Sequence, residues 1–442
     1  MANLNLGLIR AKTRSRASSP PTAEASGTLH SLRIYPAFRL LILGTLATNS
    51  AFWMYQVAVG WLALQMTDSP FFVGLSGFAG GIPLLLLSLP VGVVVDRFDR
   101  RTVLLLAQVG VMLVAGLFAM LVGTGAIAPW SILVLAAAYG TVMSFIFPTR
   151  TTMVPSLVQR RDLANAVALN AAGQNATRVV GPSLAGVLIA TIGVSWTFAV
   201  AALMQILALS TTMRLPRRMS DESVPGAGGR ESLTLGLRIV ARDPLLSALI
   251  LMALASNVLV MPYLNLMPVF ARDVLQIGST GLGLLLACAG CGTVAGALAV
   301  ARSPRLARWT GGQVVMAAAF AGLVLVFALT PNVAVAAPLL FLAGLMSASF
   351  LAVNQTALQF RVDDAVRGRV LSIYLLTWGV LPLGQLAVGA LADVVGAPLA
   401  VAGACVISLV CIALIARRYP ALRQKPGSSA AAVGLPLTRH SS

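Results

Sequence analysis

Three polar side chains recur four residues apart in an otherwise apolar stretch: Asn170, Gln174 and Arg178. Residues at this spacing share one face of an α-helix, so the two amides and the guanidinium would offer hydrogen-bond donors and a positive charge to the same neighbour. Such a face suits the binding of an anionic group, or pairing with another part of the chain during a conformational change. A third interpretation is that Arg178 extends along the helix to a polar surface and binds nothing.

Further amides and aromatic residues stand among apolar residues elsewhere. Asn49, Trp53 and Gln56 fall on one helix face, and Asn257 and Asn265 fall on another. The remaining candidates for contact with a small molecule are Tyr263, Asn354, Gln355, Trp378 and Gln385. Each candidate is equally compatible with a hydrogen bond between two helices. As a group they predict a cavity that is polar and aromatic but nearly neutral.

The elements that must position these residues are long apolar helices. Of the 442 residues, 58% are hydrophobic and 10% are charged, which is too apolar for one soluble core. A helix needs about 20 mostly apolar residues to cross a bilayer. Windows of that kind predict an all-α membrane protein with twelve spans, at about 38–66, 70–95, 102–124, 128–150, 165–192, 194–213, 244–271, 279–301, 309–330, 332–360, 368–392 and 395–416.

The placement of the charges agrees with this topology. A net charge of +18 would suit a nucleic-acid partner, but the basic residues cluster in alternate connections between spans, as the positive-inside rule describes. With both termini in the cytoplasm, only Arg178 and Arg272 depart from the pattern among the 31 Lys and Arg. Arg178 is the one charge that we place well inside a span. We expect a multi-pass bacterial inner-membrane protein whose basic surface meets lipid headgroups and no nucleic acid.

The chain divides into two halves that resemble each other. Pro36 and Asn49 recur at the same spacing as Pro244 and Asn257, and internal repeats of this kind are common in transporters. The linker between the halves is polar and rich in Pro and Gly, and it ends in a short amphipathic stretch at 233–242. We expect a disordered basic tail, a six-helix bundle, the linker, a second six-helix bundle and a second tail, at 1–37, 38–213, 214–243, 244–417 and 418–442.

A basic turn between the second and third spans carries a motif. In LPVGVVVDRFDRRTVLLL, the pattern G-x-x-x-D-R-x-x-R-R is formed by Gly92, Asp96, Arg97, Arg100 and Arg101. This resembles the loop 2–3 motif of the major facilitator superfamily, with Asp99 where the family more often has Gly. The resemblance extends over the twelve spans and the central linker. It implies a secondary transporter with the major facilitator fold, in which this loop belongs to a cytoplasmic gate.

The gate interpretation gives Asp96 a specific partner. At the inner end of span 2, Asp96 would face the positive N-terminal end of span 11, near Arg369, and pair with a neighbouring arginine. Such a contact would hold the two halves together on the inner side. The alternative is that the arginines of the loop only obey the positive-inside rule.

Span 5 carries a second motif. Gly181, Pro182 and Gly186 resemble a degenerate form of the family's antiporter motif, which implies export. Proline bends a helix and small residues let a neighbour approach, although both are frequent in any transmembrane helix. WMYQVAVGWLALQMTDSPFFVGL and the RGRV of residues 367–370 resemble the enterobactin-exporter-like and macrolide-efflux-like branch of the superfamily.

Several other functions lack the residues that they need. A phosphate-binding P-loop requires a lysine after its glycines, and Lys12 and Lys425 lie in the tails, as do both histidines. Cys288 and Cys291 form a C-x-x-C inside an apolar helix, where we expect them to pack rather than to bind metal. We therefore expect no enzyme, no cofactor and no metal site.

The acidic residues bear on how transport is coupled. All 13 Asp and Glu lie in tails, loops or span ends, so coupling would use an acid such as Asp68 or Asp96, a proton carried by the substrate, or another ion. We predict export of a small amphipathic organic compound, drug-like or siderophore-like, driven by an ion gradient, with the proton as the expected ion. The alternatives are an importer, a channel, and a membrane sensor that keeps the fold without transport.

Overall fold

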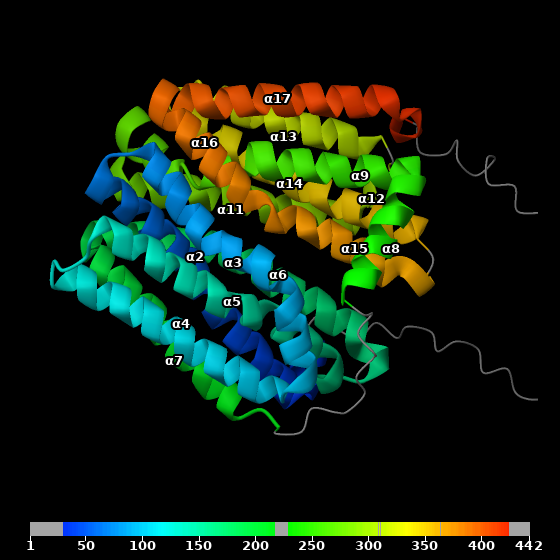
Figure 1. Cartoon of the computed structure of the whole chain (residues 1–442), viewed down its shortest axis with the longest axis horizontal. Coiled ribbons are helices and arrows are strands. Elements are labelled where there is room, and N and C mark those ends of the chain that lie inside the picture. Colours follow the sequence, from blue (N-terminus) through cyan, green and yellow to red (C-terminus); the bar gives the residue numbers. More distant parts are fainter. Residues whose placement is uncertain (1–29, 217–228, 308, 310, 363, 424–442) are drawn as a thin grey trace, which may run out of the picture.

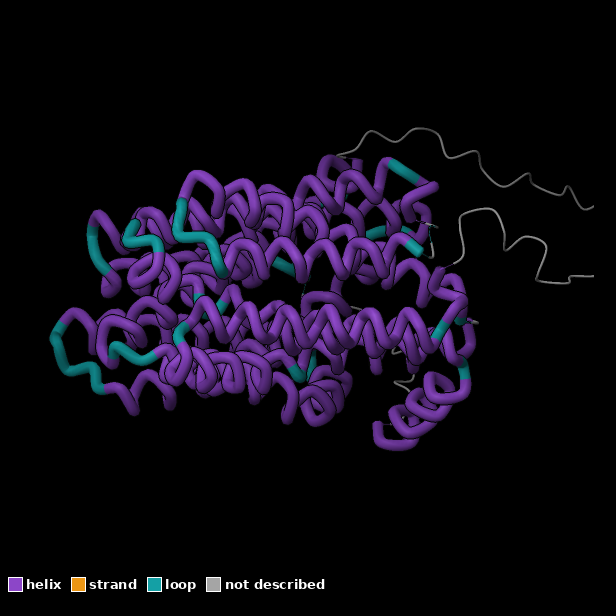
Figure 2. The backbone as a smooth tube through the Cα atoms, turned by 90° about the horizontal axis from the view of Figure 1, so that it is seen from above, coloured by secondary structure: helices purple, strands orange, loops and turns teal. Residues whose placement is uncertain are grey.

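The computed structural model describes residues 30–216, 229–307, 309, 311–362 and 364–423. Every element in these ranges is a helix. Figure 1 shows two layers, an N-terminal group coloured blue to green and a C-terminal group coloured green to red. Figure 2 shows the helices side by side along the long axis, with many connecting loops at the two ends. The all-α fold that the sequence predicts is confirmed.

The N-terminal group begins with a short helix that is fastened to the start of α6. Tyr35 Oη donates to Asp162 Oδ2 (2.6 Å), a hydrogen bond that raises the pKa of Tyr35, and Ser31 N donates to Asn165 Oδ1 (3.1 Å).

We call the end of the molecule with the first and last described residues the tail side, and the other end the far side (Figure 1). The helices of this group are α1 (His30–Ile34), α2 (Pro36–Thr67), α3 (Pro70–Arg97), α4 (Arg100–Gly123), α5 (Pro129–Leu157), α6 (Leu163–Thr191) and α7 (Val194–Met213).

The C-terminal group is built in the same way but with more interruptions. Between α9 and α11, regular helix gives way to π-helical turns at Ser256–Val260 and Phe270–Val274 and to a 3-10 turn at Met261–Leu264. The helices of this group are α8 (Gly229–Arg242), α9 (Pro244–Ala255), α10 (Met267–Val269), α11 (Gly278–Arg302), α12 (Pro304–Ala307), α13 (Gly312–Ala328), α14 (Val333–Arg361), α15 (Asp364–Gly379), α16 (Leu381–Val395) and α17 (Ala397–Arg418).

Most of these helices are able to span a membrane. Within the described residues, nine helical segments are long and apolar enough to do so by length and composition, and α13 is a shorter apolar helix. The helices α2 and α6, of 32 and 29 residues, pack among the nine, and each carries three of the polar or aromatic candidates from the sequence analysis. The number twelve depends on α2, α6 and α13, and it stays a prediction.

The amphipathic stretch of the linker lies in α8, which packs against α15. The structure begins this helix at Gly229, ahead of the predicted 233–242. Its Gly236 approaches the backbone of Arg369 so closely that an added Cβ would lie 3.0 Å from the carbonyl oxygen. Val240 is buried and Leu237 is exposed. The helix therefore has apolar residues both on a buried face and on the molecular surface.

Aromatic residues hold the core of the N-terminal group together. Tyr55 stacks on Tyr139 with ring centroids 3.5 Å apart, and Phe118 stacks on Phe198 at 4.6 Å. All four side chains are buried. Burial of such large rings fixes the positions of α2, α4, α5 and α7, and α2 and α5 both contribute to the candidate site.

Asp99 starts α4 and explains one departure from the family motif. Its Oδ2 atom accepts hydrogen bonds from the backbone N–H of Thr102 (2.8 Å) and from Thr102 Oγ1 (2.7 Å). The carboxylate therefore satisfies a backbone donor that has no partner within the helix. Glycine, the more frequent residue in the family, is tolerated at such a position for its backbone but supplies no acceptor.

We expect Asp99→Ala to lower the stability of the protein by about 1 kcal/mol, which is typical for a lost N-cap. Asp99→Ser keeps a hydrogen-bond acceptor at this position. Asp99→Gly is expected to lower the stability by only about a few tenths of a kcal/mol. Thermal unfolding of the purified variants in detergent measures the difference. Equal melting temperatures for Asp99→Ala and Asp99→Ser would contradict a capping role.

Candidate functional site

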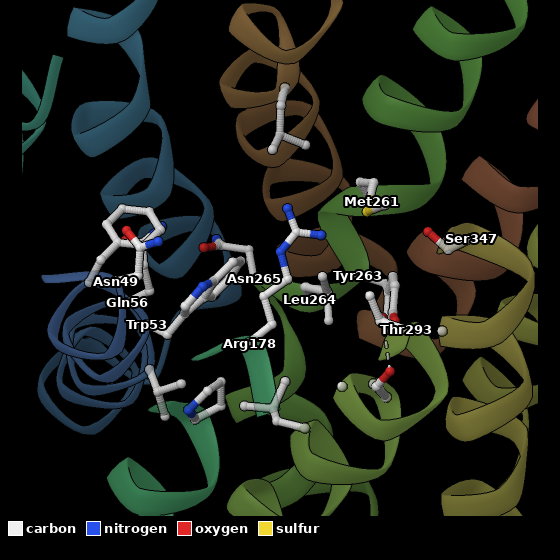
Figure 3. A pocket seen from close by; sticks show the side chains of 18 of the residues that line it. Asn49, Trp53, Gln56, Arg178, Met261, Tyr263, Leu264, Asn265, Thr293 and Ser347 are labelled. Atoms are coloured by element: carbon white, nitrogen blue, oxygen red, sulfur yellow. Dashed lines mark hydrogen bonds between the residues drawn. The ribbon is translucent and has the colours of Figure 1, made fainter. Parts of the chain in front are cut away.

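A cavity of about 370 Å³ lies between the two helix groups. The N-terminal wall comes from α2, α3, α5 and α6, and the opposite wall comes from residues 261–268, α11, α14, α15 and α16. Figure 3 shows side chains from both walls pointing into the space. Much of the wall is apolar, with Phe52, Phe147, Met261 and Leu264 among the residues that line it.

The structure brings together most of the polar candidates that the sequence analysis selects. They come from five segments of both helix groups, namely α2, α6, α15, α16 and the irregular stretch after α9, which carries two of them. The predicted residues that line the cavity are Asn49, Trp53, Gln56, Gln174, Arg178, Tyr263, Asn265, Trp378 and Gln385. Their role in binding stays a prediction.

Four of the candidates lie outside this wall. Asn257 Nδ2 donates to Thr377 Oγ1 (3.1 Å), and Asn354 Nδ2 donates to a backbone carbonyl of α9 (3.2 Å). These two residues therefore make the hydrogen bonds between helices that the sequence allows as the alternative. Gln355 is exposed and Asn170 is half-buried, and neither contributes to the lining.

Arg178 points into the cavity from α6. Its guanidinium carbon lies 5.8 Å from the centroid of the Trp53 ring, which is within the range of a cation–π interaction. Figure 3 places the guanidinium between Asn265 and Trp53 on one side and Leu264 on the other. Among the described residues, Arg178 takes part in no ion pair, and its side chain donates no hydrogen bond.

The expectation that Arg178 is the only charge well inside a span is wrong. The predicted fourth span ends at Arg150, but α5 continues to Leu157 and places Arg150 within the helix, with 6% of its surface exposed. Its Nη2 donates to Thr48 Oγ1 (2.8 Å), which in turn donates to Gln205 Oε1 (3.0 Å). The apolar pattern after the arginine is weak, because Thr151, Thr152 and Pro155 interrupt it, so the longer helix is not readily predicted from the sequence.

The glycines of the antiporter-like motif let α6 approach two neighbours. A Cβ at Gly181 would lie 2.6 Å from Trp53 Cβ of α2, and a Cβ at Gly186 would lie 2.5 Å from Gly283 Cα of α11. No side chain fits at these distances, so both positions require glycine. Pro182 lies between them and lines the cavity.

A second glycine contact joins the two groups through α3 and α16. A Cβ at Gly74 would lie 2.9 Å from Gly389 Cα, and one at Gly389 would lie 2.8 Å from Gly74 Cα. Gly74 and Gly186 both belong to the far-side portions of their helices. The two groups are therefore in backbone contact at two places between the cavity and the far side.

Ionic and polar contacts add to this closure at the far side. Arg272 Nη1 lies 2.7 Å from Asp68 Oδ1 and also donates to the Leu64 carbonyl at 3.1 Å. Asp393 Oδ1 accepts hydrogen bonds from Ser69 Oγ (2.6 Å) and from a backbone N–H of α3 (3.3 Å). The turn between α2 and α3 is thus held from two sides by the C-terminal group. We refer to Asp68, Ser69, Arg272 and Asp393 as the far-side clasp.

The residues of the loop 2–3 motif are found at the tail side, where α3 ends and α4 begins. Arg101 Nη2 donates to the Met213 carbonyl (2.6 Å) at the end of α7, and Arg100 Nη1 donates to the Thr152 carbonyl of α5 (3.4 Å). Both contacts stay within the N-terminal group. Arg97 is exposed, Gly92 has open space around it, and the Asp96 side chain lies outside the described part of the structure.

Two helix groups that enclose a cavity between them are the arrangement of a secondary transporter. Residues 26–435 match the major facilitator family described as transmembrane secretion effector. The chain belongs to that family, as the sequence resemblance predicts.

Named relatives are similar over most of their length. The multidrug efflux pump Tap of Mycobacterium tuberculosis is 30% identical over 88% of this chain and 94% of that protein. The staphyloferrin A transporter of Staphylococcus aureus is 24% identical over 78% of this chain and 86% of that protein. The enterobactin exporter EntS of Shigella flexneri is 28% identical over 77% of this chain and 80% of that protein.

Solved structures support the fold. A bacterial homologue of the human lysosomal transporter Spinster, in an inward-facing and unoccupied conformation, superposes with a TM-score of 0.67 at 15% identity and covers 88% of this chain and 99% of that chain. A POT family transporter superposes with a TM-score of 0.68 at 11% identity, with 88% and 97% covered. At these identities the likeness shows the major facilitator fold.

Proposed function

We propose that this protein exports a small amphipathic organic compound, drug-like or siderophore-like, by alternating access. The observation that carries the proposal is the cavity between the two helix groups, which glycine contacts and the far-side clasp close off at one end. Rocking of two bundles about a site between them is the mechanism that suits such a cavity. The names of the relatives, a multidrug efflux pump and an enterobactin exporter, support export as the direction.

We further propose that the protein lies in the bacterial inner membrane with its tail side in the cytoplasm. The clustering of Arg residues in the connections of that side supports this orientation. The lipid bilayer is then a partner of the exposed apolar helix faces, such as those that carry Leu106 and Val394. In this orientation the far-side clasp closes the outer end of the cavity.

The proposed driving force is an ion gradient, with the proton as the coupling ion. Among the described residues that line the cavity there is no Asp, Glu, Lys or His. The proton would travel on an acid at a span end, such as Asp68 or Asp96, or on the substrate itself. Asp96 also keeps its proposed role in a gate at the tail side, together with Gly92, Arg97, Arg100 and Arg101.

The test is accumulation of a panel of labelled drugs and siderophores in cells with and without the protein, at intact and at collapsed proton gradients. We expect lower accumulation of at least one compound in cells that contain the protein, and loss of this difference when the gradient collapses. Higher accumulation would point to import. Equal accumulation of every compound would contradict transport of this class and favour a sensor.

A further inference from the structure

The charge on the described cavity wall is positive and lies on the N-terminal side. Arg178 is the only ionised side chain among the described residues that line it. A second guanidinium, that of Arg150, lies in the same helix group and bonds to Thr48, the neighbour of the lining residue Asn49. The described aspartates are found at helix ends, in the clasp and at the tail side. The N-terminal wall therefore carries positive charge without a counter-ion in the described structure.

The Arg178 guanidinium is only partly satisfied by what surrounds it. Trp53 interacts with the charge through its ring, but a ring offers no lone pair to the five N–H donors of the group. A guanidinium in a low-dielectric site is stabilised strongly by a carboxylate that accepts two parallel hydrogen bonds. A bound anion would supply the missing acceptors and the missing negative charge.

The rest of the wall suits the body of such an anion. Phe52, Phe147, Met261 and Leu264 offer apolar contact, while the amides of Gln174 and Asn265 are able to bind further polar atoms. At about 370 Å³ the cavity has the volume of a typical small-molecule site. The arrangement favours a molecule with one anionic group and an apolar or aromatic remainder.

We propose that the cavity selects organic anions, with Arg178 binding a carboxylate or a similar oxyanion and the apolar wall holding the body of the molecule. This inference rests on the proposed function, since it names the substrate class of the same cavity. Arg150 acts through the field that it adds to the N-terminal wall and does not touch the ligand. A cation of equal size would have to approach two guanidinium groups with no acid near either in the described structure.

The experiment compares three probes with one ring system and different charge: 2-naphthoate, 2-naphthamide and 2-naphthyltrimethylammonium. Binding to the purified full-length protein is measured by equilibrium dialysis, with protein-free detergent as the blank. We expect the anion to bind about tenfold or more tightly than the neutral amide, because hydrogen bonds to a charged group are the strong ones. The cation is expected to bind more weakly than the amide.

Variants of Arg178 separate its charge from its shape. Arg178→Gln is expected to bring the anion and the amide to nearly equal affinity, while Arg178→Lys keeps part of the preference because it keeps the charge but loses the paired hydrogen bonds. Arg417→Gln, at an exposed arginine in the last turn of α17, is the matched control and is expected to bind like the wild type. Thermal unfolding of each variant confirms that it is folded.

The proposal is overturned if the wild type shows no saturable binding of naphthoate, if it prefers the amide or the cation, or if Arg178→Gln keeps the full preference for the anion. These outcomes leave the export proposal standing, because accumulation in cells does not depend on the naphthyl probes. Conversely, anion binding that depends on Arg178 together with equal accumulation of every compound in cells would refute export and keep the ligand class.

Discussion

Gly186→Leu is expected to remove most of the transport activity while leaving the protein in the membrane. Gly186 of α6 meets Gly283 of α11 so closely that an added Cβ would lie 2.5 Å from the facing Cα. A leucine side chain at this place must push the two helix groups apart on the far side of the cavity. Overpacking of this kind costs about 1–3 kcal/mol, which shifts a two-state equilibrium by about 5- to 150-fold.

The measurement is transport of an identified substrate in vesicles at matched protein abundance. Gly116→Leu is the control, because Gly116 lies in a helix with nothing within 4 Å of its would-be Cβ. We expect the control to transport normally and Gly186→Leu to lose most of its activity. Normal transport by both variants would mean that the α6–α11 contact does not have to form during the cycle.

Arg272→Glu is expected to reduce transport by opening the far-side clasp. In the wild type, Arg272 bonds to Asp68 (2.7 Å), to the Leu64 carbonyl (3.1 Å) and to Asp273 (2.6 Å). Glutamate at this position would lose all three contacts and add a third negative charge beside Asp68 and Asp273. A single exposed ion pair contributes about 0.2–1 kcal/mol, and the repulsion makes the reversal larger than a simple loss.

A charge exchange gives this prediction its control. The double variant Asp68→Arg with Arg272→Glu restores an opposite pair across the two helix groups, and we expect it to recover most of the transport that Arg272→Glu loses. High salt should reduce the defect of the single variant, because exposed charges are screened. If the double variant were as impaired as the single one, the interaction of Asp68 with Arg272 would not be what matters there.

The hydropathy of the sequence predicts the all-α fold well because each helix must satisfy its own backbone in an apolar solvent. The extent of a helix is harder to predict where it carries a charge. The predicted span that ends at Arg150 stops too early. The Arg150 side chain is buried against α2 and α7, and this burial depends on how the helices pack, which the sequence does not state. The number of spans depends on α2 and α6, which carry polar residues, and on the short helix α13.

Selection of polar residues from the sequence works best where neighbours share a helix face. Asn49, Trp53 and Gln56 line the cavity together, and so do Gln174 and Arg178. Asn257 has the same position in the predicted repeat as Asn49 but does not line the cavity, because its side chain donates a hydrogen bond to Thr377. The apolar part of the wall leaves no mark in a sequence that is apolar throughout, and only the fold reveals it.

Two segments that line opposite walls of the cavity differ in the regularity of their helices. The helix α2 runs for 32 residues without a π or 3-10 turn. The segment that the predicted sequence repeat pairs with it contains two π turns and a 3-10 turn between Ser256 and Val274. At such turns the hydrogen-bond register already deviates, and a bend there costs less than in regular helix. When the two groups rock, bending would therefore be concentrated at 256–274, while α2 would stay straight. The two halves of the chain, although similar in sequence pattern, would then bend to different extents during transport.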